Sequence, residues 1–294
     1  MTFIPLARIA RVPAVVLLVW AIVAIVAPPA MARYAPFSLV RGAGLGCQLQ
    51  QVAGSFNTAR PLDCSRALTD VYQMPLAELI ADATLRSLAL LGGAAILGLV
   101  LGTVIGVSIG ILRRHALVGG GLVAGASLLA AIPSFFVAYF LQLFVILLAS
   151  GSDRRFLPVF GFGYDEHIVL PLVAVAIPAI TVTAQLVGVR VSEVLDADFI
   201  VTANAKGLLP FSIARVHVLP HAWPVVVEAL GSGLRISVAS LPIVEYLFVW
   251  NGIGFLALQA IASRDPVALA ASAIVLGALF SLLGALSDLV KARS

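Results

Sequence analysis

Few residues in this chain could do chemistry inside a membrane, and three of them share one apolar run. Glu228, Arg235 and Glu245 fall within residues 222–249, which are otherwise mostly apolar. Charge in hydrocarbon is costly, so such residues are candidates for ion coupling or substrate contact. Glu228 and Arg235 would share one helix face about 10.5 Å apart along the axis, too far for an easy direct pair. Arg235 therefore needs another helix, water or a substrate anion as its partner.

Each pathway candidate also has a plainer explanation. Glu245 would lie near the far membrane surface, where hydration alone accounts for it. For Arg235, a structural partner on a neighbouring helix is as good an interpretation as a substrate contact. Pro133 and Ser134 are candidates because a proline frees a backbone carbonyl that a hydroxyl can partly satisfy. Such a break can line a pathway or act as a plain kink, and both alternatives stay open.

Signatures of catalysis are missing from the sequence. It contains no G-x-x-x-x-G-K-[ST] phosphate loop, no H-E-x-x-H zinc motif and no G-x-S-x-G elbow. The spacing and number of the cysteines, Cys47 and Cys64, do not suggest a metal site. They could form a disulfide in an oxidising compartment or remain two thiols. We expect no enzyme activity, no cofactor and no metal in this chain, so a partner or an ion gradient must drive its work.

The elements that position these residues are membrane helices. Hydrophobic residues make up 61% of the 294 residues and charged residues only 11%, which is too apolar for a soluble globule. Spanning roughly 30 Å of hydrocarbon takes about 20 apolar helical residues, and the runs here are too long for barrel strands. We predict an all-α polytopic membrane protein. Its six spans are expected at about residues 12–29, 87–112, 117–149, 168–189, 222–249 and 266–290.

Six spans place both termini on one side of the membrane, but loop charge barely favours either orientation. The start of the chain also fits a cleavable signal peptide that ends at Ala30-Met31-Ala32. An uncleaved first span is the better interpretation. The run is long for a signal peptide, and an odd number of remaining spans would separate the termini.

Two spans carry packing signals. Gly98, Gly102, Gly106 and Gly110 repeat every four residues, which stacks them on one face and lets another helix approach closely. Packing within the chain and dimerisation both fit this pattern. The third span is overlong, so we expect Pro133 to kink it or part of it to lie outside the hydrocarbon.

The polar stretch between the fourth and fifth spans is predicted to contain two short helices. Residues 198–206 tolerate helix, Gly207 suits a left-handed break, and residues 208–218 can form a second helix. Pro210 fits the first turn of that second helix, which is expected to stop at Leu219-Pro220.

Apolar side chains in this stretch need an explanation. Leu208, Leu209 and Phe211 would stand out from a water-facing helix, which suggests a groove on a partner. The alternative is a helix anchored in the headgroup layer, with Lys206 and Arg215 as flanking charges. The residues alone do not separate docking from anchoring.

The stretch resembles the cytoplasmic EAA loop of permease subunits of bacterial ABC importers, E-A-A-x-x-x-G, nine residues, then I-x-L-P. Gly207 and Leu219-Pro220 stand at the required separation. More narrowly it resembles the D-Y-V-R-T-A-R-A-K-G-L form of the dipeptide, oligopeptide and nickel permeases. The matching residues are Asp198, Thr202, Ala203, Ala205, Lys206, Gly207 and Leu208. Val201, Asn204 and His217 depart from the patterns.

A second stretch of the chain resembles the same family. Residues 244–254, V-E-Y-L-F-V-W-N-G-I-G, are similar to its V-E-x-x-F-x-W-P-G-[IL]-G, with Asn251 in place of the proline. Ala260-Ile261 with Arg264-Asp265 also fit, and weaker matches are Pro133-Ser134-Phe135 and Leu157-Pro158 with Gly161-Phe162-Gly163. Together the matches cover roughly residues 80–290 in the family's order, while the first 75 or so residues differ.

The resemblance implies a type I ABC importer permease fold without ATP-binding chemistry of its own. Residues 1–80 would hold the first membrane helix and an extracytoplasmic segment, and residues 81–294 the permease core. The coupling loop would span about residues 190–221 and dock through about residues 203–215. Leu208 and Phe211 would be the buried contacts, and Arg215 would end the docking segment.

The implied partners are a second homologous permease, two cytoplasmic ATPases that hold ATP and magnesium, and an extracytoplasmic binding protein. The loop would be cytoplasmic, which places both termini on the cytoplasmic side of a bacterial inner membrane. The cargo would be a di- or oligopeptide, or nickel or a metal chelate, and Arg235 could meet a peptide carboxylate. No nucleic acid is implied.

Two rival functions are open on the residues. An ion-driven secondary transporter would use Glu228 and Arg235 as coupling groups. A membrane scaffold that transports nothing would use the glycine face and the loop helix for binding alone.

Overall fold

A computed structural model describes four stretches of the chain: residues 67–113, 116–150, 157–263 and 265–291. Within these stretches the chain forms helices and no strand, which confirms the predicted all-α class. The first predicted span, the stretch Ala30-Met31-Ala32, and both Cys47 and Cys64 lie outside the described residues, so the expectations about them stay predictions.

The described residues contain four helices long and apolar enough to cross a membrane, and a bent helix pair makes a fifth candidate span. This agrees with the five spans predicted after the first. The elements are, in chain order, α4 (Ala67–Tyr72), α5 (Leu76–Leu97), the π-helical η1 (Gly98–Gly102), α6 (Thr103–Leu112), α7 (Ala116–Ala131), α8 (Ser134–Ser150), the 3-10 turn η2 (Glu166–Ile168), α9 (Val169–Leu195), α10 (Asp198–Ala205), α11 (Pro210–Ile213), the π-helical η3 (Ala214–Val218), α12 (Leu219–Phe248), α13 (Ile253–Ser263) and α14 (Pro266–Lys291).

Helix α9 is the centre of the bundle and packs against α5, α6, α7, α8 and α12. Small buried residues such as Ala176 and Ala179 line it, which lets neighbouring helices approach closely. Its contact with α12 includes a buried hydrogen bond from Ser237 Oγ to the carbonyl of Val175, 2.7 Å long. Helices α9 and α12 therefore pack tightly against each other at the centre of the bundle.

The glycine face of the second predicted span packs within the chain. Gly98, Gly102, Gly106 and Gly110 all lie against α9, where an added Cβ would approach its atoms to 2.8 Å or closer. Of the two alternatives left open by the sequence, the structure shows packing within the chain.

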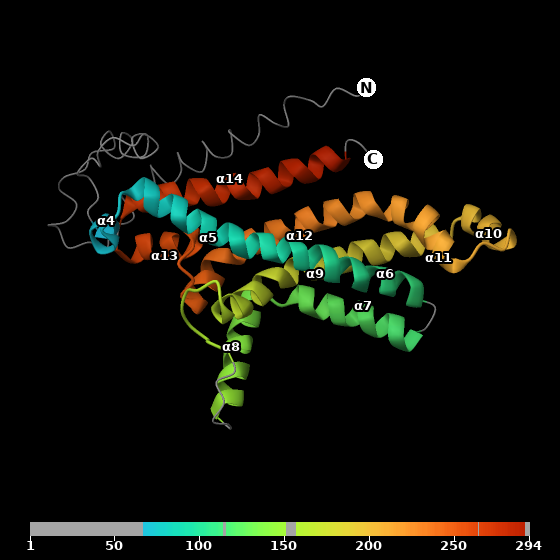
Figure 1. The fold of residues 1–294 in the computed structure, drawn as a ribbon, viewed down its shortest axis with the longest axis horizontal. Coiled ribbons are helices and arrows are strands. Elements are labelled where there is room, and N and C mark those ends of the chain that lie inside the picture. Colours follow the sequence, from blue (N-terminus) through green and yellow to red (C-terminus); the bar gives the residue numbers. More distant parts are fainter. Residues whose placement is uncertain (1–66, 114–115, 151–156, 264, 292–294) are drawn as a thin grey trace.

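The third predicted span is broken at Pro133, as expected from a proline in an overlong run. Helices α7 and α8 meet there at 99°, and α8 leaves the bundle (Figure 1). The carbonyl of Pro133 accepts a hydrogen bond from the N–H of Phe136, 2.9 Å long, and Ser134 is buried at the start of α8. The break thus directs α8 away from α7.

Helices α11, η3 and α12 form one continuous helix from Phe211 to Phe248. The expectation that the loop helix would stop at Leu219-Pro220 is therefore wrong. A proline clashes with the carbonyl four residues earlier in a regular α-helix, but the π-helical η3 changes the hydrogen-bond spacing immediately before it. The helix consequently passes Pro220 without ending.

This continuous helix is longer than a membrane requires. Its 38 residues reach about 57 Å at 1.5 Å per residue, against roughly 30 Å of hydrocarbon. One end carries α10 and the other carries α13, and these two short helices lie at opposite ends of the bundle (Figure 1). The helix therefore links two regions far apart in space.

Candidate functional site at the two ends of α12

The polar loop, defined as residues 196–211, connects α9 to α11 and includes the first two residues of α11. Its helix α10 begins at Asp198, whose carbonyl accepts a 3.1 Å hydrogen bond from Thr202 Oγ1. After α10 the chain turns at Gly207, which has a left-handed φ of 73°. Because a side chain at that φ is strained, glycine suits the turn. The sequence-based placement of a break at Gly207 agrees with this geometry.

One side of α10 is held against the bundle. Ile200 and Ala203 are buried in an apolar cluster with residues of α9, α11, η3 and α12. Phe199 stacks on His221, with ring centroids 5.4 Å apart, and Arg113 at the end of α6 forms an ion pair with Asp196. Ala203, expected in the docking segment, thus packs inside its own chain and holds the loop in place.

The other side of the polar loop and the start of α11 expose apolar side chains. Leu208 is 41% exposed, Leu209 74% and Phe211 76%. Ala205, Lys206 and Arg215 are also exposed. Large apolar side chains grouped among polar ones mark a surface for another molecule or for lipid.

The α12–α13 junction, defined as residues 245–255, lies at the opposite end of α12. Glu245 is fully buried (0% exposed). Its Oε2 accepts hydrogen bonds from the backbone N–H groups of Gly254 and Phe255, at 2.8 and 3.0 Å, and its Oε1 accepts one from Ser87 Oγ at 2.5 Å. The expectation of a hydrated Glu245 is wrong, because α13 folds back over it and offers N–H groups that lack helical partners.

Other groups of the junction are also paired. Helix α12 is capped by Val249, which has a left-handed φ of 56°. This φ is strained for a β-branched residue and is held there by its surroundings. The carbonyls of Leu247 and Phe248 accept hydrogen bonds from Gln142 Nε2 (2.7 Å) and from the N–H of Gly161 (2.9 Å). Helix α8 and the segment before α9 are thereby attached to the end of α12.

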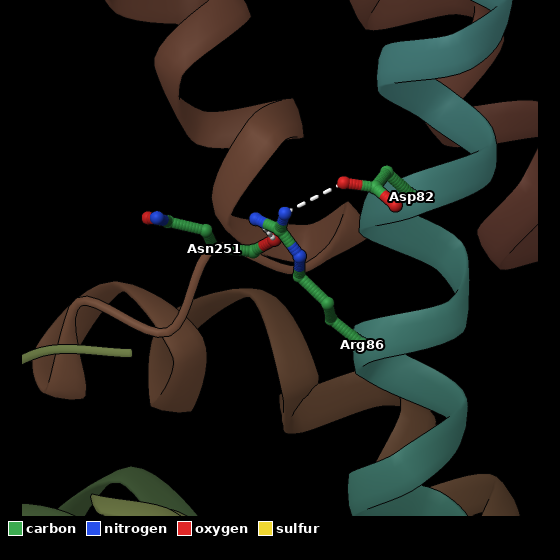
Figure 2. Close-up of polar contacts among 3 residues, drawn as sticks. All are labelled: Asp82, Arg86 and Asn251. Carbon is green, nitrogen blue, oxygen red and sulfur yellow. Dashed lines mark hydrogen bonds and ion pairs between the residues drawn. The ribbon is translucent and has the colours of Figure 1, made fainter. Parts of the chain in front are cut away.

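Helix α5 contacts the junction through Arg86, shown in Figure 2. The guanidinium lies 2.6 Å from Asp82 Oδ2 and 3.5 Å from the backbone carbonyl of Asn251. It also lies over the ring of Phe162, 4.5 Å from the centroid. The Asn251 side chain points away from Arg86 (Figure 2). A proline would present the same carbonyl, so replacing the family's proline by Asn251 leaves this contact intact.

The indole of Trp250 completes the link between α5 and the junction. Trp250 is fully buried, and its Nε1 donates to the carbonyl of Arg86 at 3.2 Å. Its ring packs on that of Phe162 with centroids 4.7 Å apart. The backbone carbonyl of Arg86 thus binds Trp250 and its guanidinium lies over Phe162, so that α5 contacts both rings of the packed pair.

Helix α4 joins the far side of α13. The hydroxyl of Tyr72 donates to Gln259 Oε1 at 2.8 Å, and burial raises the pKa of Tyr72, which favours the protonated donor. A cavity of about 50 Å³ lies between α4, α5 and α13. That is room for water rather than for a peptide.

The structure does not bring the charged pathway candidates of α12 together. Arg235 is half-buried beside α14, close to Gly284, and its Nη2 donates to Ser232 Oγ at 3.2 Å. Glu228 instead lines a cleft between α9 and α12, which also contains Arg190 and His221. The two residues therefore belong to different surroundings, and Glu245 belongs to the junction.

Comparison with known proteins decides the family. Residues 98–293 match the family described as binding-protein-dependent transport system inner membrane component. The chain belongs to this family.

Similar proteins agree with this family. The permease is 26% identical over 218 residues to the metal-staphylopine import system permease protein CntB of Staphylococcus aureus, which covers 74% of this chain and 68% of that one. It is 28% identical over 257 residues to the putrescine export system permease protein SapB of Escherichia coli, covering 77% and 78%. A chain of the inward-facing MetNI methionine ABC transporter matches its fold with a TM-score of 0.58 at 21% identity, covering 75% and 98%.

These matches confirm the predicted family and the type I permease fold. The permease is thus a membrane-spanning inner-membrane subunit of an ABC transport system that depends on a binding protein. Relatives of this kind are permease subunits and not enzymes.

The sequence analysis missed Ser87 and Arg86, which organise the junction from α5. Their partners lie more than 150 positions away in the chain, so no local pattern reveals them. The sequence carries one signal, the paired glycines of the junction motif. A Cβ on Gly252 would collide with the carboxyl group of Glu245, and one on Gly254 would collide with the backbone of Pro242. The glycine at position 252 therefore leaves room for the buried carboxyl group of Glu245.

Proposed function

We propose that this permease imports a di- or oligopeptide, or nickel or a metal chelate, driven by ATPase subunits that dock on the polar loop. The observation that carries the proposal is the exposure of Leu208, Leu209 and Phe211 on a loop whose other side is fixed to the bundle. Apolar side chains on a water-facing loop are suited to entering a groove on a partner. Residues 203–215 form the docking segment, in which Phe211 and Leu208 are the central contacts.

The names of the relatives support the substrate class. A permease of Sinorhizobium fredii that is 28% identical over 206 residues is named a probable peptide ABC transporter permease, and the relative of Staphylococcus aureus is named a metal-staphylopine import system permease. One relative is named an export system, so the direction of transport needs its own measurement.

The complete assembly would hold a second permease, two ATPases and an extracytoplasmic binding protein. ATP and magnesium would bind to the ATPases. Docking places the polar loop in the cytoplasm. With six spans, both termini would lie on that side as well. Ion-driven transport with Glu228 and Arg235 as joint coupling groups is disfavoured, because the two lie against different elements.

Phe211→Asp tests the docking. A charge on this exposed side chain is expected to leave the spans folded and to abolish co-purification of the ATPases and ATP-driven uptake. Val71→Asp is the matched control, because Val71 is similarly exposed (71%) but lies in α4 at the opposite end of the bundle. Normal co-purification and uptake in Phe211→Asp would favour the headgroup anchor and contradict the proposal.

Arg235 is proposed to contact a substrate carboxylate, since its guanidinium is half-buried beside Ser232 and α14. Arg235→Gln is expected to raise the KM for peptide uptake at least tenfold while leaving assembly unchanged. Unaltered uptake by an intact assembly would assign Arg235 a purely structural role.

A further inference from the structure

The carboxyl group of Glu245 joins three helices. It extends from α12, binds the N–H groups of Gly254 and Phe255 in α13, and accepts from Ser87 of α5. Ser87 Oγ in turn accepts a hydrogen bond from the N–H of Ile253 at 2.8 Å. Each of these groups is buried, so breaking the arrangement would leave unpaired polar atoms away from water. The three helices are therefore coupled strongly at this point.

The surrounding residues leave space for this arrangement. A Cβ on Gly252 would fall on the carboxyl group of Glu245, and one on Gly254 would lie 2.5 Å from the Cα of Pro242. Small residues at both positions thus allow α13 to press against α12. A helix cap alone would not require Ser87 from a third helix as well.

Glu245 lies at the end of α12 that is farthest from the polar loop. The polar loop lies at one end of the continuous helix Phe211–Phe248, and Glu245 lies three residues from the other. A displacement at the loop moves α13 to the same extent when the far end of α12 holds α13 firmly. The hydrogen bonds of the Glu245 carboxyl group attach α13 to α12, and its bond with Ser87 attaches α5 as well.

We propose that Glu245 is a positioning residue of the transport cycle. It makes α13 and the adjoining part of α5 move with α12 when the polar loop is displaced. This inference rests on the proposed function, because it requires ATP-driven movement at the loop. It predicts that weakening the junction separates ATP hydrolysis from uptake, an effect that a stabilising helix cap would not have.

The test compares Glu245→Ala with Asp265→Ala in the complete assembly, reconstituted with its ATPases and binding protein in proteoliposomes. Asp265 is the matched control. It is buried (2% exposed) and accepts hydrogen bonds from two N–H groups, those of Val267 and Ala268 at 3.1 and 3.0 Å, but it caps α14. Peptide uptake per ATP hydrolysed is expected to fall at least tenfold in Glu245→Ala and less than twofold in Asp265→Ala.

Two results would overturn the proposal: a normal ratio of uptake to hydrolysis in Glu245→Ala, or an equal loss in both variants. Should Glu245→Ala fail to assemble, Ser87→Ala carries the test, because it removes the bonds of α5 to Glu245 and Ile253 and leaves those from Gly254 and Phe255 to Glu245. A normal ratio in Ser87→Ala would then overturn the proposal. Glu245→Gln keeps an oxygen acceptor for the N–H groups of α13 and offers Ser87 Oγ an amide donor in place of the carboxylate acceptor. It is expected to recover at least half of the ratio.

A readout that needs no substrate separates this inference from the proposed function. Hydrogen exchange of residues 253–263 is expected to differ between nucleotide-free and vanadate-trapped wild-type assembly, and not in Glu245→Ala. A vanadate-dependent difference that persists in Glu245→Ala would overturn the proposal. Wild-type assembly that shows the exchange difference but takes up no peptide would instead contradict the proposed substrate.

Discussion

The polar loop and the α12–α13 junction lie at opposite ends of one helix and arrange their side chains in opposite ways. At the loop, Leu209 and Phe211 turn apolar surface outward. At the junction, Glu245, Ser87 and Trp250 are fully buried, and their polar groups are hydrogen-bonded within the chain. Exposed apolar side chains suit a surface that another molecule covers, whereas a satisfied buried network fixes its own chain. Under the proposed function, the loop would receive the movement of the ATPases and the junction would transmit it.

The largest expected contrast is between two aromatic residues. Trp250→Ala removes a fully buried ring and should lower the free energy of unfolding by about 3–5 kcal/mol. Phe211→Ala removes an exposed ring and should change it by about 0.5 kcal/mol or less. Unfolding of the purified permease in detergent measures both. Similar losses in the two variants would contradict the assignment of one end to the core and the other to a partner.

Glycine substitutions sharpen the same comparison. Gly254→Ala places a Cβ 3.0 Å from Glu245 Oε2 and against Pro242, and should lower the free energy of unfolding by about 1–3 kcal/mol. Gly120→Ala in α7 meets open space, so it should be neutral or slightly stabilising, because alanine favours helix. Thermal unfolding distinguishes them. A neutral Gly254→Ala would mean that the junction is looser than the structure shows.

At the loop, the turn should matter more for docking than for stability. Gly207→Ala forces a side chain into a left-handed conformation and should cost about 1–2 kcal/mol locally, with no clash in the open space around it. Co-purification of ATPase is expected to fall severalfold while the melting temperature of the spans hardly changes. Gly207→Asn, which tolerates that conformation better, should restore most of the docking. Equal defects in both variants would remove backbone conformation as the cause.

The smallest expected effect concerns the edge of the junction. Arg86→Gln removes a partly exposed ion pair with Asp82 and a contact with the ring of Phe162. Exposed pairs contribute about 1 kcal/mol or less, so the melting temperature should fall only slightly. A loss as large as that of Trp250→Ala would move the centre of the junction from Glu245 to Arg86.

Sequence reasoning succeeded where a local pattern has one physical meaning. Long apolar runs predicted the spans, the four-residue glycine period predicted a close helix contact, and Pro133 predicted a break. Gly207 was placed at a turn because few other residues accept its left-handed φ. These features depend on neighbours within one or two helical turns, which the sequence displays directly.

Sequence reasoning failed where the outcome depends on distant parts of the chain. Pro220 was taken for a stop, but η3 lets the helix continue. Glu245 was placed near water because its position along the span is visible in the sequence, whereas the return of α13 over it is not. Ser87 could not be paired with Glu245, because 158 positions separate them and only the packing of α5 on α12 joins them.

Photocrosslinking in the intact assembly tests the docking of the polar loop most directly. A photoreactive amino acid at Phe211 should crosslink to an ATPase subunit, and the same group at Val71 should not, because Val71 lies in α4 at the other end of the bundle. Crosslinks from Phe211 to lipid alone, in an assembly that hydrolyses ATP and takes up substrate, would contradict the account.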